Sequence, residues 1–220
     1  MNALKEDCLR LHDELVSLRR EFHRDPELGL HEYHTAARIE RELDRCAIPH
    51  ERIGETAVVA RLRGTGAGTG VCVLRADIDA LPIQETNDVP YRSETPGVMH
   101  ACGHDAHTTC LIGAAKVLSA HRADFGGEVR FLFQPAEETT GGAAPICAAG
   151  LLERYHVTRV FGMHLWPELP AGVIASRAGA MMSRSCELTV EITGRSVHLA
   201  RFAEGCDALD AAARLLTRLY

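Results

Sequence analysis

The feature that most constrains the fold is an alternation of short apolar runs with segments of helical pattern. Residues 71–74, 129–133 and 160–165 are apolar runs of strand length, as expected for strands buried inside a parallel or mixed sheet. Apolar residues at helical spacing occupy 107–121 and 143–155, between and after these runs. The alternation predicts an α/β fold in which a mixed sheet is flanked by helices.

Further elements are expected on the N-terminal side of this alternation. Residues 4–24 and 33–46 show helical spacing, and residues 57–62 form a short run rich in β-branched residues. The glycine-rich stretch 64–70 does not fit the dinucleotide-binding fingerprint, because no helical pattern follows it. We expect it to be a hairpin loop.

The pattern changes near residue 180. Residues 186–193 alternate apolar and polar side chains, which predicts a strand with one solvated face, and a helix is expected over 207–220. We therefore expect a first domain over residues 1–180 and the beginning of a second over 181–220. The second piece is too small to bury a core of its own.

Composition and charge exclude several classes of function. The 220 residues carry a formal net charge of -6, so there is no basic footprint for nucleic acid. No apolar run approaches the roughly 20 residues of a membrane span, and no secretory signal is seen at the start. The eight cysteines are scattered without a disulfide framework. We expect reduced cysteines and a cytoplasmic protein.

The densest chemistry lies in residues 99–107, which contain one thiol, three imidazoles and one carboxylate. Cys102 and His104 are two positions apart, so in a loop both can reach one metal ion. The alternative is a buried cysteine beside a histidine that caps the next helix. His107 is expected to begin that helix. His164 follows in the apolar run 160–165, where a histidine on its own is more often structural than a ligand.

A pair of acids, Glu137 and Glu138, follows the apolar run 129–133. Adjacent side chains can diverge, one toward a metal and one toward the water that attacks the substrate. The alternative is an exposed pair at a helix N-terminus. Asp77 and Asp79 also follow a strand, and we expect them to orient a ligand or to bond the backbone. Together with the thiol and imidazoles, these acids predict a divalent-metal hydrolytic site.

Four motifs, in this order along the chain, resemble those of bacterial and plant N-acyl-amino-acid amidohydrolases. This group includes hippurate hydrolase, aminoacylases and auxin-conjugate hydrolases, and is related to zinc carboxypeptidases. The motifs are Arg-Ala-Asp-Ile-Asp-Ala-Leu-Pro-Ile at 75–83, Met-His-Ala-Cys-Gly-His-Asp-Ala-His-Thr at 99–108, Phe-Gln-Pro-Ala-Glu-Glu at 133–138 and Gly-Met-His-Leu-Trp-Pro at 162–167.

The resemblance implies a site with two divalent metal ions. Cys102, His104, Glu138 and His164 match the metal ligands of the family, and Glu137 matches its general base. Cysteine and histidine suit zinc, and manganese is the other ion we expect first; cobalt or nickel would also be accepted by such donors. The implied reaction is hydrolysis of the amide bond of a small N-acyl amino acid.

The resemblance also implies a smaller α+β lid domain inserted in the catalytic domain, through which many members form homodimers. The residues after about 180 resemble the start of that lid. His198 resembles a lid histidine that stabilises the oxyanion, although Ser196-Val197 stands where many members have Gly-Gly. Family members continue past the position matching Tyr220, with a last metal-ligating histidine, so the chain resembles their N-terminal part.

Three alternatives stay open beside an amidohydrolase. The chain can be an inactive metal-binding fragment of such an enzyme, or a carboxypeptidase that acts on small peptides. It can also be a structural zinc protein, which would hold its metal in a closed site of four ligands.

Overall fold

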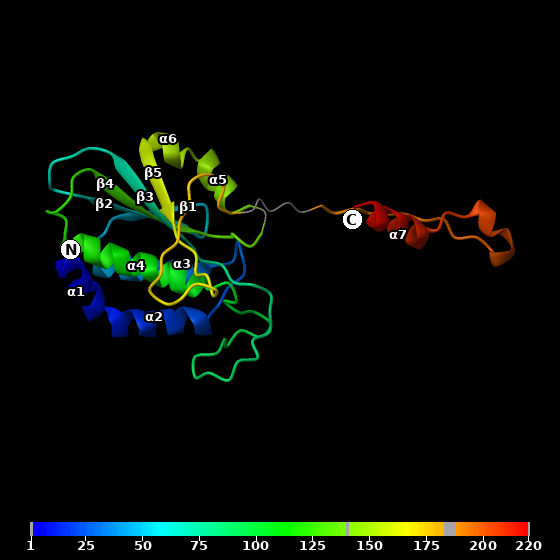
Figure 1. The fold of residues 1–220 in the computed structure, drawn as a ribbon, viewed down its shortest axis with the longest axis horizontal. Coiled ribbons are helices and arrows are strands. Elements are labelled where there is room, and N and C mark those ends of the chain that lie inside the picture. The colour runs from blue at the N-terminus through cyan, green and yellow to red at the C-terminus, as the bar shows by residue number, and fades with distance from the viewer. Residues whose placement is uncertain (1, 140, 183–187, 220) are drawn as a thin grey trace. The chain divides into compact units, whose positions relative to one another are not determined.

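The computed structural model describes residues 2–139, 141–182 and 188–219. These residues form two units, Met1–Val173 and Ile174–Tyr220, and each is described by itself. At the centre of the first unit is a mixed five-stranded sheet (Figure 1). Its strands are β1 (His50–Ile53), β2 (Ala57–Arg63), β3 (Val71–Asp77), β4 (Glu128–Gln134) and β5 (Val157–Gly162).

The strand order is β1-β2-β4-β3-β5. Strand β3 is parallel to both β4 and β5, whereas β2 is antiparallel to β1 and to β4. The predicted α/β fold with a mixed sheet flanked by helices is confirmed.

Helices cover both faces of this sheet (Figure 1). On one side are α1 (Asn2–Arg10), α2 (His12–Arg24), α3 (Tyr33–Arg45) and α4 (His104–Ala120); on the other are α5 (Ala143–Ala148) and α6 (Leu151–Arg154). Because side chains alternate along a strand, β2 contributes side chains to the core on both faces of the sheet. Val58 and Ala60 pack in the cluster that contains α2, α3 and α4, and Ala57 and Val59 pack in the cluster that contains α5 and α6.

Several helices differ in their bounds from the sequence expectation. The single helix expected over 4–24 is two helices, separated at Leu11. The helix expected over 143–155 is likewise interrupted, because Gly150 has a φ of +74° and so leaves the helical conformation. Helix α4 begins at His104, three residues earlier than expected, after Gly103 in the left-handed conformation.

The glycine-rich stretch 64–70 is a loop, but the predicted hairpin is wrong, because β4 lies between β2 and β3. The loop runs beside the residues that lead into β4. The Gly64 amide donates to the Gly127 carbonyl at 3.0 Å. A Cβ on Gly126 would lie 2.2 Å from the Ala67 carbonyl oxygen, so glycine is needed for this approach. The stretch therefore packs against the chain before β4 and does not form a tight turn between paired strands.

The second unit contains the 3-10 helix η1 (Leu199–Glu204) and the helix α7 (Ala208–Leu219), with an isolated bridge between Arg195 and Cys206. Of the strand predicted over 186–193, residues 186–187 lie outside the described residues, and residues 188–193 are not in a strand. A strand needs a bonded neighbour, and within the described part of the unit only the Arg195–Cys206 bridge pairs.

Across the residues that the structure describes, no helix is long and apolar enough to cross a membrane.

Candidate metal centre

The parallel strands bring polar residues from distant parts of the chain to one edge of the sheet. Because β4 and β5 both run parallel to β3, the carboxyl ends of all three strands lie on the same side. Asp77 ends β3, the glutamate pair follows β4, and His164 follows β5. Helix α4 begins with His104, whose ring lies close to Asp77 and the glutamate pair, so its first turn joins the same group.

Three overlapping groups of side chains have ligand atoms within 4.8 Å of one another, and His104 belongs to all three. The groups are Cys102, His104 and His164; His104, Glu137 and Glu138; and Asp77, His104 and His107. The Sγ atom of Cys102 lies 3.3 Å from Nε2 of His164. Nε2 of His104 lies 3.8 Å from a carboxylate oxygen of Glu137 and 3.8 Å from one of Glu138. The other three predicted ligands and the predicted base therefore converge on His104.

Two buried atoms at this centre have no hydrogen-bond partner among the described residues: Nε2 of His104 and Oε1 of Glu138. The 3.8 Å between them is too long for a hydrogen bond. Burying polar atoms without a partner is unfavourable, and a cation between them would satisfy both. The donor set, with one thiol, two imidazoles and a carboxylate, fits a divalent metal ion.

Asp79 orients two of the candidate metal ligands, His104 and Glu138. Nδ1 of His104 donates to the Asp79 carbonyl at 2.9 Å and lies 3.2 Å from its carboxylate, which leaves Nε2 free to face a metal. The other carboxylate oxygen of Asp79 accepts the Glu138 amide at 2.9 Å. Burial alone would raise the pKa of Asp79, but these hydrogen bonds outweigh it and lower the pKa.

A further series of contacts, through Asp77 and His107, holds the loop that carries His164. Nδ1 of His107 lies 2.6 Å from the Asp77 carboxylate, and the Leu165 amide donates to Nε2 of His107 at 2.9 Å. Arg75 pairs with the other oxygen of Asp77 at 2.6 Å. Burial would raise the pKa of Asp77, but the His107 bond and the charges of His104 and Arg75 lower it to about 2. His107 thus lies within α4 and holds the backbone next to His164.

The electrostatic potential at the centre is negative. Burial, together with the hydrogen bond and charge of Glu138, raises the pKa of the Cys102 thiol to about 12. Burial alone would lower the pKa of His104, but the carboxylates of Asp79, Asp77 and Glu138 raise it. The carboxylates that cause both shifts make the centre electrostatically negative, and such a site attracts a cation.

Two predicted site residues are exposed: His164, which contacts Cys102, and His198. His164 is exposed and lies two residues beyond the end of β5, not within a strand as expected. The position after an edge strand accounts for its exposure. His198 belongs to the second unit, where its Nδ1 accepts the Ala200 amide at 3.2 Å and caps η1. Its catalytic role stays a prediction.

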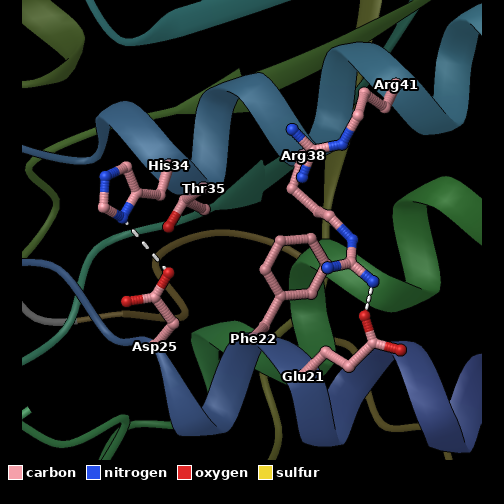
Figure 2. Close-up of a pocket in the computed structure, with 7 residues that line it drawn as sticks. All are labelled: Glu21, Phe22, Asp25, His34, Thr35, Arg38 and Arg41. Carbon is pink, nitrogen blue, oxygen red and sulfur yellow. Dashed lines mark hydrogen bonds and ion pairs between the residues drawn. The ribbon is translucent and has the colours of Figure 1, made fainter. Parts of the chain in front are cut away.

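The structure also contains a small cavity of about 80 Å³ between α2 and α3. Figure 2 shows Arg38 directed at Glu21, and His34 directed at Asp25 across the same hollow. None of the predicted ligands lines the cavity, so it is separate from the candidate metal centre.

Comparison with known proteins identifies relatives over nearly all of the chain. The chain is 40% identical over 210 residues to N-acetylcysteine deacetylase of Bacillus subtilis, and the match covers 94% of this chain and 54% of the relative. It is 41% identical over 208 residues to IAA-amino acid hydrolase ILR1-like 4 of Arabidopsis thaliana, covering 94% and 46%. The chain therefore spans about half the length of the curated relatives that it matches.

A solved structure resembles about three quarters of the chain. It is the YXEP protein of Bacillus subtilis, described as a dinuclear metal-binding peptidase of the M20 family, with a TM-score of 0.71 and 44% identity. The match covers 74% of this chain and 46% of that one. The family model for peptidase family M20/M25/M40 matches residues 73–219, the segment that includes the candidate ligands. On this evidence the chain belongs to peptidase family M20/M25/M40.

Proposed function

We propose that the protein hydrolyses the amide bond of N-acyl amino acids or of similar small conjugates, with two divalent metal ions as cofactors. The observation that carries the proposal is a pair of buried ligand atoms, Nε2 of His104 and Oε1 of Glu138, which have no hydrogen-bond partner among the described residues. Cys102 and His164 lie beside them. The names of two relatives, N-acetylcysteine deacetylase and IAA-amino acid hydrolase, support this substrate class.

The two adjacent acids differ in ways that favour different roles. The Glu138 side chain is 21% exposed and its amide is held by Asp79, which suits a metal ligand. The Glu137 side chain is 42% exposed, which suits a base that receives water and substrate. In the proposed reaction Glu137 accepts a proton from the attacking water and passes it to the leaving nitrogen. Bound metal ions would polarise the scissile carbonyl and lower the pKa of the water.

The remaining parts of the proposal come from the family resemblance. His198 would stabilise the oxyanion. Residues 181–220 would begin a lid domain, following a catalytic domain over 1–180, and the lid would support a homodimer. Zinc or manganese is the proposed metal, because the donors are a thiol, imidazoles and a carboxylate. No nucleic acid or membrane partner is proposed, and the cytoplasm is the proposed compartment.

Peptide cleavage is the second candidate function, since one relative is thermostable carboxypeptidase 2 of Saccharolobus solfataricus. The identity is 38% over 224 residues, covering 100% of this chain and 56% of the relative. This candidate uses the same metal centre and differs in the substrate. An inactive metal-binding fragment is the third candidate, because the chain spans about half of its relatives.

The test measures bound metal and hydrolysis together. The purified chain is loaded with zinc or manganese, its metal content is measured, and it is assayed on hippurate, on N-acetyl amino acids and on small peptides. Metal binding with hydrolysis of the acyl amino acids supports the proposal. Peptide cleavage alone supports the carboxypeptidase, metal without hydrolysis supports the inactive fragment, and absence of metal contradicts the proposed centre.

A pair of variants tests the division of labour between the acids. Glu137→Gln should retain the metal and lose turnover by roughly 10²- to 10⁴-fold, the usual contribution of a general base. Glu138→Gln should lose metal. If the metal content of Glu137→Gln falls in step with its activity, the assigned roles are wrong.

A further inference from the structure

The backbone between β4 and the glutamate pair is strained. Ala136 has a φ of +50°, in the left-handed region that residues with a Cβ rarely adopt. Such conformations persist where the surrounding structure imposes them, and they are concentrated at functional sites. Ala136 directly precedes Glu137 and Glu138, so its conformation sets the direction in which both acids leave the strand.

Two buried carboxylates hold this segment through its amides. Oε1 of Glu32 accepts the Ala136 amide at 2.8 Å, and Oδ2 of Asp79 accepts the Glu138 amide at 2.9 Å. Glu137 therefore lies between two fixed amides. Glu32 is 104 residues away from Ala136 in the sequence and is 0% exposed.

The surrounding backbone confines the same segment. A Cβ on Gly29 would lie 3.1 Å from Cα of Ala136, and a Cβ on Gly142 would lie 1.8 Å from the Pro135 carbonyl oxygen. The Gly142 amide also donates to the Ala136 carbonyl at 3.2 Å. The left-handed turn is thus held from several sides, and Glu32 supplies its side-chain acceptor.

Helix capping does not explain the burial of Glu32. Glu32 is the N-cap of α3, but its side chain makes no capping hydrogen bond there. The Glu27 carboxylate does that by accepting the amides of His34 and Thr35. Oε2 of Glu32 has no hydrogen-bond partner among the described residues, and burial raises the pKa of this carboxyl. A buried group with an unsatisfied oxygen is unfavourable for folding and is typical of a functional position.

We propose that Glu32 is a positioning residue, which fixes the orientation of Glu137 and Glu138 through the Ala136 amide. The inference rests on the proposed function of that pair. Glu32 does not belong to the candidate ligands itself but holds the backbone that carries them. Residues that orient ligands in other metal sites act in the same way.

The experiment compares four variants of the full chain. Glu32→Ala removes the acceptor, Glu32→Asp shortens the side chain so that it no longer reaches Ala136, and Glu32→Gln keeps an acceptor oxygen. Glu42→Gln is the matched control: Glu42 lies on α3, which Glu32 precedes, and is only 3% exposed, but it pairs with Arg45 and Lys116. The readouts are amide hydrogen exchange at Ala136 by NMR, affinity for zinc, and kcat and KM where turnover is measurable.

We expect Glu32→Ala and Glu32→Asp to speed exchange at Ala136 at least about tenfold and to lower zinc affinity or kcat by about 10- to 100-fold, with little change in KM. Glu32→Gln should keep most of both properties, and Glu42→Gln should leave them unchanged. If Glu32→Ala does not fold, Glu32→Asp gives the same test.

The inference is overturned if the wild-type Ala136 amide exchanges as fast as an unprotected amide. It is also overturned if either acceptor-removing variant keeps wild-type exchange and zinc affinity. A wild-type chain that binds no zinc contradicts the proposed function instead, and the Ala136 exchange rates then still decide whether Glu32 holds the loop.

Discussion

His23 is a buried histidine held between two acids, one of which, Asp105, directly follows the candidate ligand His104. Its Nδ1 lies 2.7 Å from Asp105 at the start of α4, and its Nε2 lies 3.2 Å from Glu85. The Asp105 bond raises the pKa of His23, and the Glu85 bond adds to this, against the opposing effect of burial. The charged form of His23 therefore joins α2 to α4 and to the loop that follows β3.

This contact predicts a pH-dependent contribution to stability. Because the pKa of His23 is raised in the folded state, the contribution is fully present below 6.5, its ordinary value, and is lost as pH rises through the folded pKa. Asp105 and Glu85 have lowered pKa values, so both are still ionised at pH 5.5. We expect His23→Gln to cost about 2 kcal/mol at pH 5.5, the usual value of a charged hydrogen bond, and less at pH 9.

Urea unfolding of wild type and His23→Gln from pH 5.5 to pH 9 measures this difference. The exposed pair of His34 and Asp25 gives a control, His34→Gln, whose effect should be small at every pH. A difference between wild type and His23→Gln that stays constant over this range would show that His23 acts by packing alone.

At the residue scale the sequence predicted part of the centre. Cys102 and His104 could be selected because they lie two positions apart in the segment richest in ligand-type side chains, and the glutamate pair because it follows an apolar strand. The structure brings these residues together. Glu32 and His23 were missed. Their partners are 104 and 82 residues away, and nothing in a helical pattern distinguishes a buried glutamate or histidine from an exposed one.

At the scale of elements, strand identity was easier to predict than strand pairing. The apolar runs predicted β3, β4 and the neighbourhood of β5, because parallel strands inside a sheet are apolar on both faces. The burial expected of the run 160–165 was wrong, because β5 is at the edge of the sheet and is mostly exposed. The position of β4 between β2 and β3 depends on contacts between residues far apart in sequence. The glycine-rich stretch between β2 and β3 therefore led to the wrong prediction that these two strands pair as a hairpin. The short β1 was also missed, because its residues, His-Glu-Arg-Ile, are mostly polar.

The junction between β4 and α5 predicts a sharp difference between two adjacent glycines. A Cβ on Gly142 would lie 1.8 Å from the Pro135 carbonyl oxygen, whereas a Cβ on Gly141 would have nothing within 4 Å. We expect Gly142→Ala to lower the free energy of unfolding by roughly 1–3 kcal/mol, as overpacking does, because the backbone must shift. Gly141→Ala should be close to neutral.

Urea unfolding midpoints of the two variants check this expectation. Zinc affinity is a second readout, since the segment displaced by Gly142→Ala leads directly into the glutamate pair. Equal stability of the two variants would mean that the approach of Gly142 to Pro135 is not maintained in solution.

At the scale of the whole molecule, the buried hydrophobic residues that the structure describes all lie in the first unit. Most of them form two clusters, one on each face of the sheet. In the described part of the second unit no residue is buried, and large apolar residues of η1 and α7, such as Phe202 and Leu209, are exposed. Hydrophobic burial therefore stabilises the first unit and gives the second little stability of its own.

This contrast predicts how two shortened chains would behave. A chain ending at Val173 retains the whole sheet and both clusters, so we expect it to unfold cooperatively, with an enthalpy of about 120 kcal/mol from the usual value per residue. Residues 174–220 alone should show no cooperative transition. Scanning calorimetry and circular dichroism of both chains measure this. A sharp transition in residues 174–220, or none in the chain ending at Val173, would show that the two clusters are not the source of stability, since neither cluster includes a residue of the second unit.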